Sequence, residues 1–174
     1  MTQSGPRWTG TKTEDADRQK WRTPDYLFKW LSDLYGPFTI DCAASEQNTM
    51  CERYFTEEMN ALKQIVNFGE MCFLNPPFNN IKPFIEWVMW QRDNLRATFA
   101  VVLPSDLSTQ WGELVTRQAS EIIHITGGRV NYVHNMSGKE IKGNNKPTII
   151  AVFRPDDRSA STRYFPLRKI KART

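Results

Sequence analysis

Residues 71–78 read MCFLNPPF, and this stretch decides how the rest of the chain is interpreted. Its first four residues form a short apolar run, which is typical of a buried strand. The run ends at Asn75, Pro76, Pro77 and Phe78. Because proline fixes φ and has no backbone N–H, the two prolines stop the strand and stiffen the chain that follows. We therefore expect residues 71–74 to deliver a rigid, exposed loop to the edge of a sheet.

This loop places an amide oxygen from Asn75, the carbonyl oxygen of Pro76 and the aromatic face of Phe78 close together. Such groups suit a flat heterocycle that carries an exocyclic NH2 group. The amine would donate its two hydrogens to Asn75 and to the Pro76 carbonyl, and the ring would stack on Phe78. The sequence thus predicts the catalytic loop of an amino-methyltransferase. The competing interpretation is a plain Pro-Pro turn, which the preceding apolar run disfavours.

The composition is that of one globular domain: 174 residues, of which 40% are hydrophobic. No apolar run approaches the roughly 20 residues needed to span a membrane, and residues 1–22 contain no apolar signal core. We therefore expect a protein of the cytoplasm with no membrane partner. The three cysteines lack CxxC spacing and there are only two histidines. This pattern argues against a disulfide framework, a structural zinc site or any other metal.

Positive charge is concentrated at the end of the chain. Residues 154–174 contain seven Lys or Arg against two Asp, a balance of +5, so the rest of the +4 chain sums to −1. Such a segment suits contact with phosphates, although a solvated terminus explains it equally well. We divide the chain into a mobile leader (1–22), a single catalytic domain (23–154) and a basic C-terminal tail (155–174).

Helical and strand patterns alternate along the chain, which indicates a doubly wound α/β domain with a mixed, mostly parallel sheet and helices on both faces. The first helix is expected over residues 24–35, with Thr23 as its N-cap and Pro24 in its first turn. Further helices are expected from Pro83 and over 110–118, and a weak one over 58–66. The expected strands are 38–40, 53–56, 71–74, 98–103, 121–125, 128–133 and 148–153, with a polar loop at 134–146.

Four residues lie at the ends of expected strands: Asp41, Glu57, Asn75 and Pro104. In open α/β sheets, ligands bind beyond the carboxyl ends of the strands. We therefore expect these residues to share one edge of the sheet and to form the site there.

Several of these motifs occur together in one known family. They are Thr23-Pro24, Asp41-Cys42-Ala43-Ala44, Asn48, Cys51, Tyr54, the loop at 75–78, Gly128-Arg129-Val130-Asn131-Tyr132 and the strand at 148–153. This series, over roughly residues 21–154, resembles the phage-type Dam family of DNA N6-adenine methyltransferases. The resemblance implies a Rossmann-like class I fold, S-adenosylmethionine as cofactor and DNA as partner, in a monomer or a homodimer. It also suggests protection of phage DNA against host restriction.

The resemblance further implies which residues hold the cofactor. These are Thr23 and Pro24, Asp41 and Ala43 near the methionine part, Glu57 or its neighbour Glu58 on the ribose, and Asn75. Other interpretations stay open for most of them. Thr23 and Asp41 would also serve as helix caps, and the two glutamates as a solvated charge pair. The usual glycine-rich motif is absent.

For the substrate side, Ser105 and Asp106 follow the strand at 98–103 and are expected to wall the target pocket. Arg129 is a candidate for a phosphate contact or for the pocket, with a plain surface charge as the alternative. Lys139 and Lys142 in the loop at 134–146 are candidate DNA contacts, unless this loop is an ordinary hairpin connection.

Two classes of alternative function stay open. The same fold would serve a different amine: cytosine N4, adenine in RNA, or a glutamine side chain of a protein. Alternatively, the chain would be a non-catalytic DNA-binding module, which the missing glycine-rich motif favours and the intact loop at 75–78 disfavours.

Overall fold

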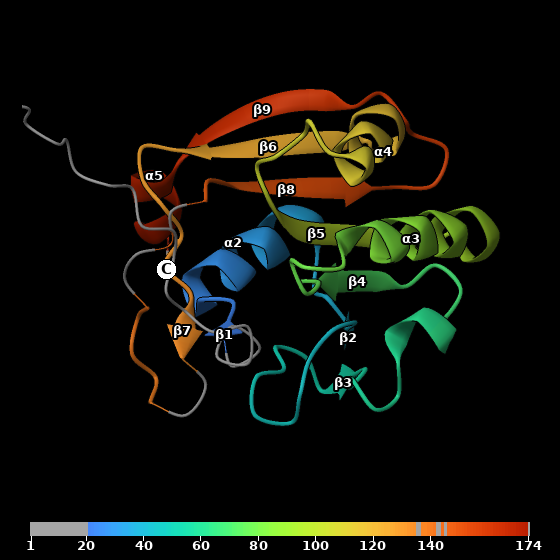
Figure 1. The fold of residues 1–174 in the computed structure, drawn as a ribbon, viewed down its shortest axis with the longest axis horizontal. Helices are drawn as coiled ribbons and strands as arrows, with labels where there is room; N and C mark the ends of the chain where they lie inside the picture. Colours follow the sequence, from blue (N-terminus) through green and yellow to red (C-terminus); the bar gives the residue numbers. More distant parts are fainter. Residues whose placement is uncertain (1–20, 135–136, 142–143, 145, 174) are drawn as a thin grey trace, which may run out of the picture.

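The computed structural model describes residues 21–134, 137–141, 144 and 146–173. Seven strands of this described part form one sheet in the order β3-β2-β4-β5-β8-β6-β9 (Figure 1). Their bounds are β2 Ile40–Asp41, β3 Arg53–Tyr54, β4 Met71–Leu74, β5 Thr98–Pro104, β6 Glu121–Thr126, β8 Thr148–Phe153 and β9 Ser161–Pro166. A separate pair, β1 Trp21–Arg22 and β7 Val133–His134, forms a small antiparallel sheet.

The large sheet is mostly parallel. Strands β3, β2, β4 and β5 pair in parallel, and β6 pairs in parallel with β9. Strand β8 runs antiparallel to both of its neighbours, β5 and β6. Six of the seven strands therefore point the same way, as the arrowheads of β6 and β9 show against that of β8 in Figure 1. The expected mixed, mostly parallel sheet is confirmed.

Helices cover both faces of this sheet, as expected. Alternate residues of β4 show why: Cys72 and Leu74 belong to one buried core, and Phe73 to the other. The first core lies under α3 (Ile81–Leu95) and α4 (Gln110–Gln118), together with the short 3₁₀ helix η1 (Ala61–Lys63). The second lies under α2 (Asp25–Tyr35) and α5 (Leu167–Lys171). A strand buried on both faces needs the continuous apolar run seen in the sequence.

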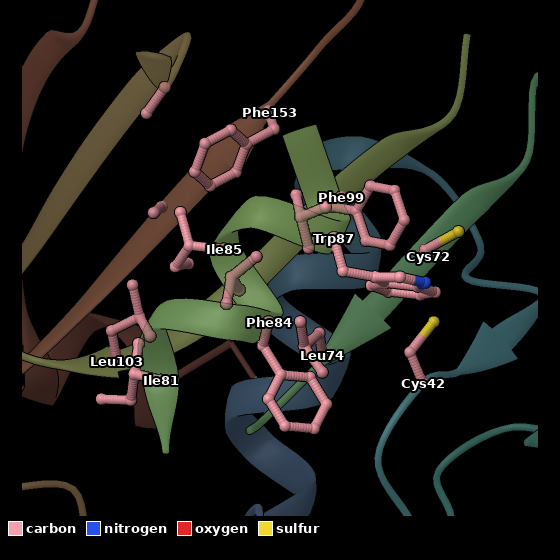
Figure 2. Packing of buried hydrophobic residues seen from close by; sticks show 14 of the residues in the cluster. Cys42, Cys72, Leu74, Ile81, Phe84, Ile85, Trp87, Phe99, Leu103 and Phe153 are labelled. Atoms are coloured by element: carbon pink, nitrogen blue, oxygen red, sulfur yellow. The ribbon is translucent and has the colours of Figure 1, made fainter. Parts of the chain in front are cut away.

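Helix α3 fastens the loop at 75–78 to the first core, because it begins at Ile81, shortly after that loop. Figure 2 shows its side chains Phe84, Ile85 and Trp87 packed against residues of the strands. The rings of Trp87 and Phe99 meet edge to face, with centroids 5.5 Å apart. Pro83 lies in the first turn of α3, as predicted. The start of α3, and with it the end of the loop, is thus fixed by buried contacts.

The strand predicted over residues 128–133 is wrong except at its end. Only Val133 and His134 form a strand, β7, and its partner is β1. Gly127 has a φ of 72°, so the chain turns away from β6 here and no strand of the large sheet lies beside residues 128–132. The weak helix predicted over residues 58–66 is also wrong, except for the single 3₁₀ turn η1. A helix cannot continue through Asn60, because this residue adopts a left-handed φ of 54°.

The boundaries predicted between leader, domain and tail also need correction at both ends of the domain. Residues 161–171 are part of the fold: β9 pairs with β6 over six residues, and Leu167 and Ile170 of α5 are buried. Trp21 and Arg22, assigned to the leader, form β1, whereas residues 1–20 lie outside the described part of the chain. None of the helices in the described part is both long and apolar enough to cross a membrane.

Candidate active site at the carboxyl edge of the sheet

The parallel strands bring the predicted site residues to one edge. In the sheet register, Asp41 of β2 lies beside Phe73 of β4, and Leu74 lies beside Val101 of β5. The backbone N–H of Cys42 donates to the carbonyl of Phe73 at 2.9 Å, which joins the two strand ends. Asp41 and Asn75 therefore emerge from neighbouring strands, with Pro104 at the end of the next one. Their shared position, predicted from strand ends alone, is confirmed.

Asn75 has one end of its amide engaged and the other end open. Its Nδ2 donates to Thr23 Oγ1 at 3.2 Å. Its Oδ1 is buried, and no described residue donates a hydrogen bond to it. Leaving a buried acceptor unpaired costs about 1–3 kcal/mol, so such an atom is a candidate for contact with a ligand. The site thus presents a fixed acceptor at the start of the loop.

The rest of the loop is built as a platform. Pro76 is buried, whereas Pro77 is exposed and its carbonyl accepts from the Asn80 N–H at 3.0 Å, closing the turn into α3. Phe78 is 36% exposed. Its ring meets the ring of Tyr132 edge to face, with centroids 6.1 Å apart and planes at 76°. One side of Phe78 is therefore supported, while part of the ring is available for stacking.

Thr23 and Pro24 have a different local role from the one expected. Helix α2 begins at Asp25 with Pro24 as its N-cap, so Thr23 does not cap it. The Pro24 carbonyl accepts from the Leu27 and Phe28 N–H groups at 2.9 and 3.2 Å. Thr23 is only 3% exposed, and its hydroxyl oxygen lies against Asn75 instead.

Asp41 is buried and holds the loop that follows β2. Its Oδ1 accepts from the Ala43 N–H at 3.3 Å and its Oδ2 from the Met50 N–H at 3.1 Å. Burial raises the pKa of Asp41 to about 6, against the opposing effect of these two hydrogen bonds. No helix begins here, so the helix-cap alternative is wrong. Ala43 itself is half-buried against the core under α3.

Glu57 and Glu58 lie three and four residues beyond β3, the strand next to β2. Both are exposed. The Glu57 carbonyl accepts from the Asn60 N–H at 3.0 Å, so the turn that carries both carboxylates is closed by the backbone.

Ser105 is half-buried beyond β5, and its N–H donates to the Pro147 carbonyl at 2.8 Å. Asp106 is exposed and accepts from Ser108 Oγ at 2.7 Å. The turn continues to Thr109, whose Oγ1 caps α4 by accepting from the Gly112 N–H at 3.1 Å. Ser105 is thus held at the site edge by a backbone contact, and Asp106 by a side-chain contact within the turn.

The candidate DNA contacts are solvent-facing where the structure describes them. Arg129 and Lys139 are exposed, and Lys142 lies outside the described residues. Lys139 belongs to a hairpin: Val133 bridges Glu140, and the Ile141 N–H donates to the Tyr132 carbonyl at 2.8 Å. The hairpin predicted as the alternative for this loop is therefore present, and a DNA contact by Lys139 stays a prediction.

Sequence reasoning missed the aromatic residues behind the loop. Tyr132 is 2% exposed, supports Phe78, and burial raises the pKa of its hydroxyl. Tyr26 of α2 lies nearby, and burial followed by the charge of Glu140 raises its pKa to about 12. The alternation of Val130 and Tyr132, both buried, was the available signal that this segment faces the interior.

Comparison with known proteins identifies relatives over nearly the whole chain. The family model described as DNA N-6-adenine-methyltransferase (Dam) matches residues 10–171. A DNA N-6-adenine-methyltransferase of Escherichia phage T1 is 32% identical over 183 residues, covering 96% of this chain and 76% of the relative. A protein of the same name from Haemophilus phage HP1 is 32% identical over 148 residues, which cover 84% of this chain and 85% of the relative.

A shorter match joins the chain to a putative methyltransferase, YfdM, of Escherichia coli K12, which is 36% identical over 64 residues, or 34% of this chain and 70% of the relative. The family match spans the sheet, the loop at 75–78 and the final strand and helix together. The chain therefore belongs to the Dam family of DNA N-6-adenine-methyltransferases.

Proposed function

We propose that this protein transfers a methyl group from S-adenosylmethionine to the N6 amine of adenine in DNA, on a Rossmann-like class I methyltransferase fold. Membership of the Dam family and the names of the two phage relatives support this reaction. The observation that carries it is the buried Oδ1 of Asn75, an acceptor that no described residue occupies. A phage-type enzyme of this kind would work in the cytoplasm of a bacterial cell, where its DNA substrate is.

The loop would act on the nucleophile through hydrogen bonds. The lone pair of an adenine amine is delocalised into the ring, which makes the nitrogen a poor nucleophile. Asn75 Oδ1 would accept one N–H of the amine, and the Pro76 carbonyl would accept the other. Two acceptors favour a tetrahedral nitrogen and return the lone pair to it. An amide does not take up a full proton at neutral pH, so the contribution of the loop is positioning and electrostatic stabilisation.

The target base would be recognised by stacking. Phe78 has an exposed part of its ring and is held from behind by Tyr132. An adenine inside a duplex hides its N6 amine in the stack, so the base must leave the helix to reach this loop. Ser105 follows the neighbouring strand and would wall the same pocket. Arg129, Lys139 and Lys142 would contact the phosphates.

The residues at the edge of β2, β3 and β4 fit a nucleoside cofactor. When bound, S-adenosylmethionine supplies a methyl group on a sulfonium sulfur, which is already a strong electrophile. Glu57 is exposed beyond β3, the neighbour of β2, and would accept hydrogen bonds from the two ribose hydroxyls. Asp41 has both oxygens on the Ala43 and Met50 N–H groups. It would therefore shape the loop that carries Ala43, and Thr23, Pro24 and Asn75 would line the methionine side.

Product analysis tests this function. The purified protein is incubated with S-adenosylmethionine and unmethylated DNA, the DNA is digested to nucleosides, and methylated bases are measured by mass spectrometry. We expect N6-methyladenine. N4-methylcytosine, or methylation only of RNA or of a protein glutamine, would show a different acceptor for the same loop. No product on any of these, with no heat of cofactor binding in calorimetry, would indicate a non-catalytic DNA-binding module and contradict the proposal.

A further inference from the structure

We propose that Thr23 is a positioning residue for Asn75: its side chain engages the nitrogen of the Asn75 amide and so directs the amide oxygen toward the reacting amine. This inference rests on the proposed function. It assigns to Thr23 a role in the chemical step, separate from the cofactor contact expected from the sequence.

The contact itself is buried and specific. Asn75 Nδ2 donates to Thr23 Oγ1 at 3.2 Å, and Thr23 is 3% exposed, so water does not readily replace this partner. An asparagine amide has two planar orientations that exchange its oxygen and nitrogen. The Thr23 hydroxyl can accept from the amide nitrogen or donate to the amide oxygen; here it accepts from the nitrogen, which leaves the oxygen at the buried position without a partner. In the reverse orientation, an NH2 group would meet the NH2 group of the base, and both would be donors.

The backbone on either side of Thr23 is fixed, which makes it a rigid support. Before it, Trp21 and Arg22 pair with His134 and Val133 in the small sheet β1–β7. After it, the Pro24 carbonyl accepts two N–H groups of the first turn of α2. A hydroxyl held by a strand on one side and a helix on the other keeps its place better than one on a surface loop.

The same small sheet supports both ends of the catalytic loop. Thr23 directly follows β1 and holds Asn75, the first residue of the loop. Tyr132 directly precedes β7 and holds Phe78, the last one. Figure 1 shows β1 and β7 at the left, the side toward which the arrowheads of β6 and β9 point. The residues next to β1 and β7 thus contact the first and the last residue of the loop, and this small sheet would hold the loop in place.

The test separates turnover from cofactor binding. Thr23→Val keeps the shape of the side chain and removes its hydroxyl, and Thr23→Ser keeps the hydroxyl and removes a methyl group. We expect Thr23→Val to lower kcat by about tenfold or more, the effect of losing one buried hydrogen bond. The Kd for S-adenosylmethionine should change far less than kcat, and the melting temperature should fall by no more than the few degrees that one lost buried hydrogen bond costs. Thr23→Ser should restore kcat to within about threefold. Thr116→Val, at an exposed threonine of α4, is the matched control and should leave kcat unchanged.

Three results would overturn the proposal: a wild-type kcat in Thr23→Val, a weakened cofactor Kd with unchanged kcat at saturation, or a loss that serine does not restore. If the wild type methylates no acceptor, the proposed function has failed, and the positioning role is then judged by NMR. The side-chain NH2 signals of Asn75 should shift and exchange faster in Thr23→Val. Unchanged signals would overturn the positioning role by themselves.

Discussion

At the scale of single residues, the site uses two polar side chains with buried oxygens in opposite ways. Asp41 has both oxygens engaged by the backbone of its own loop, whereas Asn75 keeps its oxygen open. A side chain whose acceptors are filled shapes the site, and one with an open acceptor binds a substrate. This difference is the reason why we propose that Asp41 supports the loop after β2 and that Asn75 contacts the amine.

Burial of Asp41 predicts a pH dependence of stability. Its pKa is about 6 in the folded protein and near 4 in an unfolded chain, so folding binds a proton between these values. The stabilising contribution is complete below about pH 4 and is lost as the pH rises through about 6. We expect the free energy of unfolding of the wild type, relative to Asp41→Asn, to fall by roughly 2 kcal/mol between pH 4 and pH 7.

Urea unfolding of both proteins at several pH values measures this difference, in which the titrations of other groups cancel. Asp33→Asn, at an exposed aspartate of α2, is the control and should show no comparable trend. A difference between wild type and Asp41→Asn that does not change with pH would show that Asp41 is not buried in its charged form.

Site residues marked by adjacent residues in the sequence could be predicted from the sequence. Asn75 and Phe78 were found because the apolar run and the prolines beside them are local signals. The contact between Thr23 and Asn75 was not, because the two are 52 positions apart. It depends on the pairing of β1 with β7, and two-residue strands leave no periodic pattern.

At the scale of elements, the turn after β5 is determined by close packing between backbones. Gly112 lies in the first turn of α4, and a Cβ atom there would come within 2.5 Å of the Leu107 backbone. Real Cβ atoms do not approach backbone this closely. The glycine is therefore required by its neighbour, although glycine within a helix is otherwise unfavourable.

This contact predicts the sign of a substitution. Helix propensity alone gives Gly112→Ala a gain of about 1 kcal/mol, whereas the contact predicts a loss of about 1–3 kcal/mol through displacement of the turn. We expect the melting temperature to fall, and the activity to fall with it because Ser105 precedes this turn. Thermal unfolding of Gly112→Ala shows whether the substitution stabilises or destabilises the protein, with Thr116→Ala as the exposed control in the same helix. A more stable Gly112→Ala would contradict the packing described here.

Elements with strong patterns were predicted closely, and short ones were not. The bounds of β4, α4 and β8 agree with expectation, because each has either a continuous apolar run or helical spacing. Val130 and Tyr132 alternate like a strand yet form none, since a strand also needs a neighbour with which to pair. The pattern reported their burial correctly and their secondary structure incorrectly.

At the scale of the whole molecule, the C-terminal segment completes the sheet. Strand β9 covers the edge of β6, and Arg163 on it binds the buried Glu121 at 2.7 Å. Glu121 also accepts from Tyr35 of α2 at 2.8 Å and pairs with Arg154 at 3.1 Å. Burial raises the pKa of Glu121, but these hydrogen bonds and the charge of Arg163 outweigh it and lower the pKa overall. One carboxylate thus joins helix α2 to strand β9.

Truncation after Arg158 tests this role. It removes β9 and α5, leaves the edge of β6 unpaired, and uncovers the core beneath Leu167 and Ile170, each worth about 1.5–3 kcal/mol when buried. We expect an insoluble or unfolded product. The control replaces the exposed Arg168 and Lys169 by alanine, which removes charge and keeps the strand. A truncated protein with the melting temperature of the full chain would show that the segment is a dispensable tail.

The sequence predicted the architecture of the sheet and missed its last strand for a physical reason. The side chains of β9 are mostly exposed, so no apolar run or alternation marks it. An edge strand is held largely by backbone hydrogen bonds to its neighbour, which the residue types do not reveal. The basic residues within and around it therefore suggested a basic tail, although Arg163 of this strand forms an ion pair with a buried acid.

The central claim is that the open oxygen of Asn75 acts in the chemical step, and Asn75→Ala tests it most directly. The measurement compares this variant with the wild type for methyl transfer to DNA at saturating S-adenosylmethionine, together with the cofactor Kd from calorimetry. We predict a fall in turnover of at least about a hundredfold, comparable with the loss of other single groups that stabilise a transition state, and a far smaller change in the cofactor Kd. Full activity in Asn75→Ala would contradict the account, because the loop at 75–78 would then not be the catalytic loop.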